Sequence, residues 1–231
     1  FMILGTRCTR ACRFCAVDKG TPRPPDPDEP ERIGRAAESL NLNYVVITSV
    51  TRDDLIDGGA EQFSRTINHV RQRCRRAKIE VLIPDFRGSI SALQTVCTVH
   101  PNVLNHNVET VARLYPAVRP GAHYRRSLGI LAYAAQQRVS VKSGIMLGLG
   151  ETPSEIEKSL IDLKQTGCRC LTLGQYLAPS KHHHPMARFV SPAEFNKWAA
   201  FAHQLGFTGV AAGPLVRSSY QAEKMFAEAN G

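Results

Sequence analysis

Three cysteines near the start of the chain are the residues best suited to carry chemistry. Cys8, Cys12 and Cys15 have the spacing C-x3-C-x2-C and fall within one short loop candidate. Soft thiolate ligands suit iron, and their close spacing lets one loop wrap around a cubane iron–sulfur cluster. Three ligands for four irons leave one iron open to an outside molecule. The pattern therefore predicts a 4Fe–4S cluster that takes part in a reaction.

A zinc site and a set of disulfides are the competing interpretations of these cysteines. Structural zinc usually takes four ligands in two pairs, and no second C-x2-C pair occurs in the sequence. Three clustered cysteines leave an odd one, which disfavours disulfides. The iron–sulfur interpretation is preferred, with zinc as the alternative. The other four cysteines are interpreted as small buried apolar residues: Cys74, Cys97, Cys168 and Cys170.

Alternating strand and helix candidates must position this loop. Apolar, β-branched segments predict strands at 1–5, 44–50, 79–83, 103–108, 139–149 and 171–177. Helical periodicity begins near Pro30 and returns at 63–74, 90–99, 124–138, 153–166 and 192–205. Repeated βα units imply parallel strands with right-handed crossovers, and six units are too few to close an eight-stranded barrel. We predict an α/β fold, a partial TIM-like (β/α)6 barrel over 1–178 with a C-terminal helical extension over 179–231 packed on it.

Polar residues follow each predicted strand. In βα barrels the reacting groups gather where strands end, because those loops converge over one end of the barrel. The cysteines follow the first strand, and other polar or glycine residues follow the rest: Thr48, Ser49, Asp53, Asp54, Asp85, Arg87, Asn107, Glu109, Gly148 and Gln175. We therefore expect one polar site at this end of the barrel.

Six further segments narrow the interpretation. They are 45–55 (VVITSVTRDDL), 84–88 (PDFRG), 105–109 (NHNVE), 142–151 (KSGIMLGLGE), 171–177 (LTLGQYL) and 217–220 (RSSY). With the cysteine loop, the chain resembles the radical S-adenosylmethionine (SAM) enzymes and, among them, the lipoyl synthases. The resemblance implies the same partial barrel.

The resemblance also implies a reaction. A reduced 4Fe–4S cluster would cleave SAM to methionine and a 5′-deoxyadenosyl radical, and sulfur would enter C6 and C8 of a protein-bound octanoyl group. The implied partners are octanoylated lipoyl-carrier domains or the glycine cleavage H protein, and a reductant such as ferredoxin or flavodoxin. A second, auxiliary 4Fe–4S cluster is implied, held by an N-terminal C-x4-C-x5-C motif and a serine of the RSSY motif.

The auxiliary-cluster ligands are incomplete in this sequence. No cysteine precedes Cys8, whereas the serine is retained as Ser219, with Ser218 as the fallback. We therefore expect that the chain is truncated at its N-terminus and that the auxiliary cluster is present only in the full-length protein. The chain beginning at Phe1 should cleave SAM but should not complete lipoyl formation.

Roles for the SAM contacts follow from the resemblance. Asp53 or Asp54 is assigned to the ammonium group, Arg125 to the carboxylate or ribose, and Asn107 with Glu109 to the ribose hydroxyls. Phe14 is placed near the adenine, with a loop anchor in the core as its alternative. The remaining predicted SAM contacts are Thr48, Ser49, Gly148 and Gln175, and the substrate-side candidates are Arg87, His183 and Arg217.

Composition limits the other function classes. The 231 residues carry a formal net charge of +9, which suits nucleic acid or an acidic carrier protein. We prefer the carrier because the densest basic run, 71–78, lies at a predicted helix end and has no aromatic interleaving. No apolar run approaches the roughly 20 residues of a membrane span. Free cysteines favour a reducing, cytoplasmic compartment. Radical SAM sulfur insertion into RNA, or a non-catalytic iron–sulfur-binding fragment, remain the alternatives.

Overall fold

A seven-stranded parallel sheet is the framework of the computed structural model, which describes residues 1–230, with Asn230 described by its backbone alone. The strand order is β1-β4-β5-β6-β7-β8-β9, and each neighbouring pair is parallel. The strands are β1 (Met2–Ile3), β4 (Tyr44–Ser49), β5 (Lys78–Leu82), β6 (Val103–Asn105), β7 (Ser140–Leu147), β8 (Cys170–Gln175) and β9 (Gly209–Gly213). A separate small sheet pairs β2 (Arg7–Cys8) with β3 (Asp18–Lys19).

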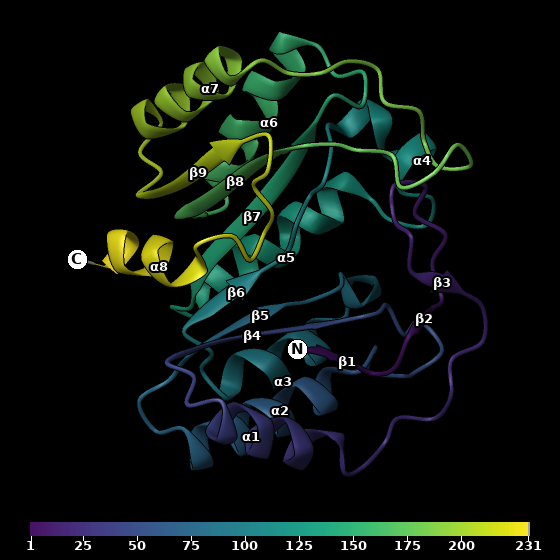
Figure 1. Ribbon diagram of the computed structural model, residues 1–231, viewed down its shortest axis with the longest axis vertical. Helices are drawn as coiled ribbons and strands as arrows, with labels where there is room; N and C mark the ends of the chain where they lie inside the picture. Colours follow the sequence, from purple (N-terminus) through teal and green to yellow (C-terminus); the bar gives the residue numbers. More distant parts are fainter. Residues whose placement is uncertain (231) are drawn as a thin grey trace.

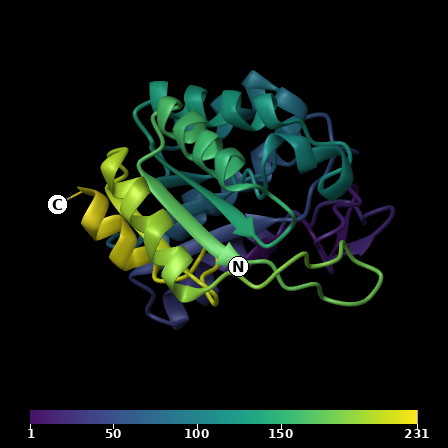
Figure 2. The same cartoon turned by 90° about the horizontal axis from the view of Figure 1, so that it is seen from above.

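The helices are α1 (Glu29–Ser39), α2 (Ala60–Arg73), α3 (Ile90–Thr98), α4 (Tyr115–Val118), α5 (Tyr124–Gln136), α6 (Pro153–Gln165), α7 (Pro192–Gln204) and α8 (Ala222–Asn230). Helices α1 to α3 and α5 to α7 cover the outer face of the curved sheet (Figures 1 and 2). Two short 3₁₀ turns lie at Phe86–Gly88 and Ala112–Leu114. Local sequence determines where two of these helices begin, because Thr152 and Glu155 form a capping box at the N-terminus of α6 and Ser191 caps the N-terminus of α7.

Alternate strand residues divide between two environments. Ile47, Val81 and Leu171 are fully buried in the continuous apolar core that also includes helix residues such as Phe63 and Leu160. Residues of the opposite parity face the inside of the barrel, since successive side chains point to opposite faces of a strand. The interior is therefore free to carry polar side chains while the outer face supplies the hydrophobic stabilisation.

One buried ion pair occupies the interior. Lys142 Nζ lies 2.9 Å from Glu80 Oε1, and Glu80 also accepts hydrogen bonds from Asn105 Nδ2 (3.1 Å) and Tyr44 Oη (2.8 Å). These residues lie on β4 to β7, and none of them lines the cavity that the cysteines border. The ion pair is therefore separate from that cavity.

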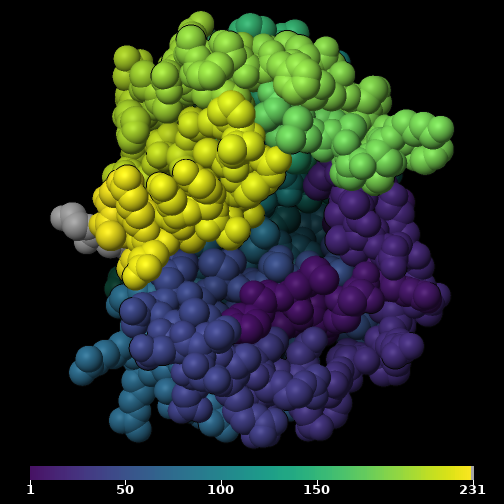
Figure 3. All heavy atoms as spheres, viewed as in Figure 1, coloured from purple at the N-terminus to yellow at the C-terminus, as the bar shows by residue number. Residues whose placement is uncertain are grey.

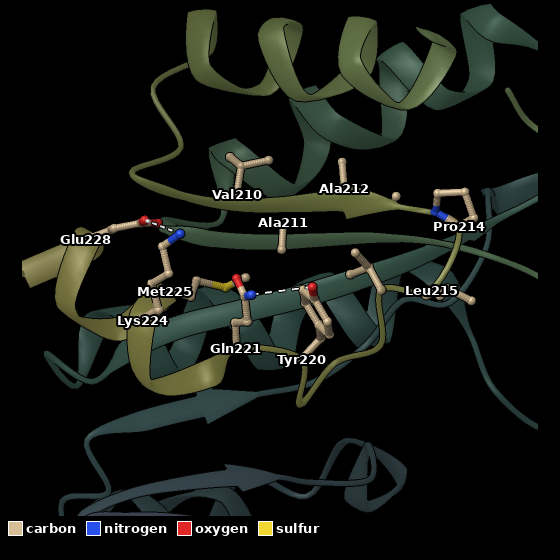
Figure 4. A pocket seen from close by; sticks show the side chains of 12 residues that line it. Val210, Ala211, Ala212, Pro214, Leu215, Tyr220, Gln221, Lys224, Met225 and Glu228 are labelled. Atoms are coloured by element: carbon tan, nitrogen blue, oxygen red, sulfur yellow. Dashed lines mark hydrogen bonds and ion pairs between the residues drawn. The ribbon is translucent and has the colours of Figure 1, made fainter. Parts of the chain in front are cut away.

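The C-terminal segment lies along the open side of the barrel. In Figure 4 helix α8 runs beside β9, where Met225 meets Gly209; the Phe226 ring lies 6.2 Å from that of Tyr44 on β4. A Cβ on Gly174 would lie 2.2 Å from Val216 O, so the loop after β9 packs directly on the β8 backbone. The segment thus connects β9 with the opposite side of the sheet.

The predicted partial barrel is confirmed, but the prediction of six strands was one short. Strand β9 pairs in register with β8 and extends the sheet into the segment expected to be a helical extension. Its sequence, Gly-Val-Ala-Ala-Gly, contains one β-branched residue and two glycines, so local propensity gives little strand signal. The division of the chain at residue 178 stays a prediction.

Candidate active site

The three cysteines line one cavity at the carboxyl ends of the strands. Cys8, Cys12 and Cys15 border a cavity of about 250 Å³. Other residues of its wall come from β1, β4, β5 and the segment after β6: Met2, Thr48, Ser49, Leu82, Asn107, Glu109 and Arg119. Figure 3 shows a hollow between the yellow C-terminal segment and the purple N-terminal loop. The predicted convergence of strand ends on one site holds for these elements.

The cysteine loop is fixed by backbone contacts on several sides. Arg13 N donates to Val118 O at the end of α4 (2.8 Å), and Arg13 O accepts from His184 N (2.8 Å). Thr9 N donates to Thr51 O (3.0 Å) after β4. Because three separate segments hold the loop, the protein positions the cysteines before any ligand binds.

The environment of the thiols suits iron–sulfur ligation. Backbone N–H groups of Arg10 and Thr51 donate to Cys8 Sγ at 3.5 and 3.4 Å, a kind of contact that tunes cluster thiolates. Burial raises the pKa of the Cys12 and Cys15 thiols, so iron must displace their protons on binding. These three half-buried sulfurs at one cavity fit three corners of a 4Fe–4S cluster.

A single shared metal ion has a different requirement. Zinc binds thiolates at about 2.3 Å, so its ligands must converge on one point. Among residues 1–230, no three Cys, His, Asp or Glu side chains form such a group. A cubane gives each cysteine its own iron, which is the arrangement that separated thiols around a cavity can serve.

The cavity wall also carries polar atoms suited to a bound cofactor. Asn107 Oδ1 and Ser49 Oγ are buried and have no hydrogen-bond partner in the described chain. Buried polar atoms are normally satisfied, so their location indicates a polar ligand. Burial raises the pKa of Glu109, and the nearby Arg119 opposes that shift. Asn107, Glu109, Thr48 and Ser49 are thus placed together with the cysteines, as the sequence predicted.

Asp53 and Asp54 form ion pairs with arginines and do not line the cysteine cavity. Arg10 donates to both Asp53 oxygens (2.7 and 2.9 Å) and to Asp85 Oδ1 (2.5 Å), and Arg52 donates to Asp54 (2.8 Å). These pairs hold the pKa of Asp85 at about 2 and that of Asp54 below its usual range. Neither aspartate lines the cysteine cavity; with Arg87 they border a neighbouring surface hollow. Their assignment to the SAM ammonium gains no geometric support.

Gln175 and Gly148 anchor the segment 177–190, called here the strap. Gln175 Nε2 donates to Leu147 O (3.2 Å) and Arg188 O (3.1 Å), and its Oε1 accepts from Val190 N (2.8 Å). Gly148 has a φ of 97°, and a Cβ there would lie 2.4 Å from Gln175 Nε2. Both residues lie outside the cavity wall in positions that anchor the strap, and their predicted SAM contacts stay predictions.

The strap reaches back to the cysteine loop, as Figures 1 and 2 show. Its His184 N bonds Arg13 O, and its His184 O accepts from Tyr176 Oη (2.6 Å). His183 Nδ1 lies 2.8 Å from Ser180 Oγ within the strap. The histidine run therefore forms part of a support for the loop, and the substrate-side role of His183 stays a prediction.

Phe14 lies between the cavity and the apolar packing beside it. It lines the cavity and also packs against a small apolar cluster that includes Val118, Leu149 and Tyr176. This apolar cluster connects the cysteine loop with the strap and with α4. A contact with adenine stays a prediction.

Arg125 and the RSSY motif lie away from the cavity wall. Arg125 borders a separate hollow with Lys158 and Asp162. Arg217 donates to Val216 O (2.7 Å), and Ser219 is exposed on the loop before α8, next to the groove drawn in Figure 4. The cavity instead contains Arg119, which sequence reasoning missed because nothing in Val-Arg-Pro-Gly marks a buried arginine.

Comparison with known proteins identifies the family. The model of the radical SAM superfamily matches residues 2–163. The chain is 54% identical to the lipoyl synthase of Methylococcus capsulatus over 98% of this chain and 71% of that protein. It is 52% identical to that of Acidithiobacillus ferrooxidans over 100% of this chain and 74% of that protein. The chain belongs to the lipoyl synthase family.

The family assignment agrees with the structure. A crystal structure of HydG, a maturase of the FeFe-hydrogenase, superposes with a TM-score of 0.71 at 14% identity, over 99% of this chain and 54% of that one. The predicted radical SAM fold is therefore confirmed, as are the predicted cofactors, a 4Fe–4S cluster and SAM, through the lipoyl synthase relatives. Across residues 1–230, none of the helices has the length and apolar character needed to cross a membrane.

Proposed function

We propose that this chain is the radical SAM core of a lipoyl synthase, which inserts sulfur at C6 and C8 of a protein-bound octanoyl group to form the lipoyl cofactor. The observation that carries the proposal is the convergence of Cys8, Cys12 and Cys15 on a cavity whose wall also holds the unpartnered Asn107 Oδ1. The lipoyl synthase relatives support the choice of substrate.

The residues of the site divide the work. When bound and reduced, the cluster supplies the electron that cleaves SAM and generates a radical able to take hydrogen from unactivated carbon. Cys8, Cys12 and Cys15 would hold three of its irons, and Asn107 with Glu109 would orient the nucleoside of SAM. The strap and the apolar side chains around Phe14 and Tyr176 exclude water from one side of the cysteine loop. The protein thus binds and orients, which is its part in cofactor chemistry.

Sulfur transfer requires a donor besides SAM. We propose that an auxiliary cluster supplies it, with Ser219 as one ligand and Ser218 as the fallback. Ser219 is exposed on the loop between β9 and α8, which supports its availability to an outside group.

The carrier domain approaches the carboxyl end of the barrel. We propose an octanoylated lipoyl-carrier domain or H protein as the partner, because its acyl-lysine must reach the cysteine cavity. The basic run 71–78 lies at the amino end of β5 instead, and two of its arginines are bonded internally, Arg71 to Val99 O (2.7 Å) and Arg73 to Glu38 (3.0 Å). Arg87 and Arg217 are exposed on loops that follow strands and suit an acidic partner better.

The electron source and compartment follow from the chemistry. A ferredoxin or flavodoxin would reduce the cluster at the carboxyl end of the barrel. All seven cysteines are free thiols, which supports a reducing, cytoplasmic environment.

Anaerobic reconstitution tests the core of this proposal. The protein, loaded with iron and sulfide and reduced with dithionite, should contain one cluster and convert SAM to 5′-deoxyadenosine. Cys12→Ala should lose both properties, whereas Cys74→Ala, a half-buried cysteine outside the cavity, should keep them. Binding of zinc in place of iron, or intact SAM under strong reductant, would refute the proposal.

A further inference from the structure

Arg119 is a buried cation without a carboxylate partner. Its side chain is largely buried (the residue is 8% exposed) and lines the cavity beside the cysteines. Its Nη1 donates to Asn107 O (3.0 Å), Val108 O (3.1 Å) and Tyr115 Oη (3.0 Å). Its Nε is buried and has no partner within residues 1–230. All of its hydrogen-bond partners are neutral oxygens, so no ion pair within residues 1–230 neutralises the guanidinium directly.

The other buried arginines near the cysteine cavity, Arg10 and Arg52, form ion pairs with aspartates. Arg10 pairs with Asp53 and Asp85, and Arg52 pairs with Asp54. A buried charge that lacks a counter-charge carries a desolvation cost of several kcal/mol. The contrast therefore indicates that an anion is missing beside Arg119, and that the anion belongs to a ligand of the cavity.

The position of Arg119 ties it to the cysteine loop. Val118, the preceding residue, accepts the hydrogen bond of Arg13 N, and Arg13 directly follows Cys12. Arg119 and Cys12 also border the same cavity. Glu109 is close enough to interact electrostatically with Arg119, but the two form no ion pair within 4.0 Å. Cys12 is thus the anchored neighbour whose ligand can supply the missing charge.

The guanidinium is held in a fixed orientation. Its carbon lies 5.2 Å from the centroid of the Tyr115 ring, and its Nη1 has three acceptors. A cation fixed before the ligand binds loses little energy to reorganisation, so its field acts fully on a nearby charge.

We propose that Arg119 is the counter-charge of the anionic, thiolate-ligated cluster and favours its reduced state. The inference rests on the proposed function, because it takes a 4Fe–4S cluster as the group held by the three cysteines. Reduction adds one negative charge to that group. A fixed positive charge nearby stabilises the reduced form and raises the reduction potential, which depends on local charge and solvent exposure.

Potentiometry of Arg119→Gln tests this inference without SAM. The reconstituted variant should bind iron as the unsubstituted protein does, yet at one ambient potential its ratio of reduced to oxidised cluster should fall about tenfold or more, a shift of about 59 mV for one electron. Arg119→Lys keeps the charge and should stay near the original potential. Arg138→Gln removes the same charge from an exposed residue outside the cavity wall and should leave the potential unchanged, because solvent and salt screen it.

The outcomes separate the inference from the proposed function. An unchanged potential in Arg119→Gln with weaker SAM binding in calorimetry would overturn the inference and assign Arg119 to the SAM carboxylate. If Arg119→Gln fails to fold, Arg119→Met keeps an unbranched apolar side chain in place of the arginine stem and must show the same negative shift. Failure of the unsubstituted protein to take up iron would instead refute the proposed function.

Discussion

Gly144 on β7 faces the Asn107 side chain so closely that a Cβ at its position would force Asn107 and Thr172 to shift. A Cβ on Gly144 would lie 2.9 Å from Asn107 Oδ1 and 2.5 Å from Thr172 Oγ1. Asn107 Oδ1 is the buried acceptor without a partner in the cavity wall. The glycine therefore leaves the space in which this acceptor can meet a ligand.

Gly144→Ala should weaken SAM binding by at least about tenfold, because the added methyl displaces Asn107, and it should destabilise the fold by about 1–3 kcal/mol through overpacking. Calorimetric SAM titration and chemical denaturation measure the two effects. Gly129→Ala is the matched control, since its Cβ meets nothing within 4 Å on α5. That control should gain about 0.5–1 kcal/mol from helix propensity. Equal SAM affinity in both variants would contradict the role of Gly144.

Asn107 and Gln175 should respond in opposite ways to truncation. Asn107→Ala should lower SAM affinity with a small change in stability, because its Oδ1 has no partner inside the protein. Gln175→Ala removes the partner of Val190 N and Arg188 O in the strap, which should cost about 2–4 kcal/mol in the free energy of unfolding. SAM titration and urea denaturation of the two variants give the comparison. A large loss of stability in Asn107→Ala would argue for a structural role.

Part of this site was predictable from the sequence because its signals are local. The spacing of Cys8, Cys12 and Cys15 and the alternation of strands and helices are short-range patterns, and they located the loop and six strands. Arg10 meets Asp53 across 43 positions, so the pairing that removes Asp53 from the cavity left no local trace.

Burial was the second property that the sequence did not carry. Arg119 is buried by the packing of α4 against the cysteine loop, and β9 is a strand because β8 offers it an edge. Neither follows from the residue types, since arginine is usually exposed and Gly-Val-Ala-Ala-Gly favours no strand. Tertiary context decided both.

The Glu80–Lys142 pair should be costly to break and cheap to replace. Lys142→Met leaves the Glu80 carboxylate buried without its cation, which should destabilise the protein by about 3–5 kcal/mol. The double substitution Glu80→Leu with Lys142→Met should recover most of that loss. The exposed pair of Lys158 and Asp162 is the control, and Lys158→Met should cost at most about 1 kcal/mol. Denaturant midpoints report all three. Additive losses in the double variant would contradict the expectation.

His106 should make stability depend on pH between about 6.5 and 4. Burial lowers its pKa from 6.5 to about 4, and its ring nitrogens contact Ile83 O (2.9 Å) and Ser127 Oγ (3.0 Å). Between pH 6.5 and 4, His106 binds a proton in the unfolded chain but stays neutral in the folded protein. The free energy of unfolding therefore falls as the pH falls, and the loss is complete below about pH 4. The full effect is at most about 3 kcal/mol.

His106→Asn removes this titration and isolates its contribution. The variant loses a packed ring and should be less stable at pH 7, but the difference from the unsubstituted protein should shrink as the pH is lowered from 6.5 to 4. Urea denaturation at fixed cluster loading across this range gives the curve, and comparison at each pH cancels the titration of Asp85, whose pKa is about 2. A difference that stays constant with pH would show that His106 takes up its proton equally in both states.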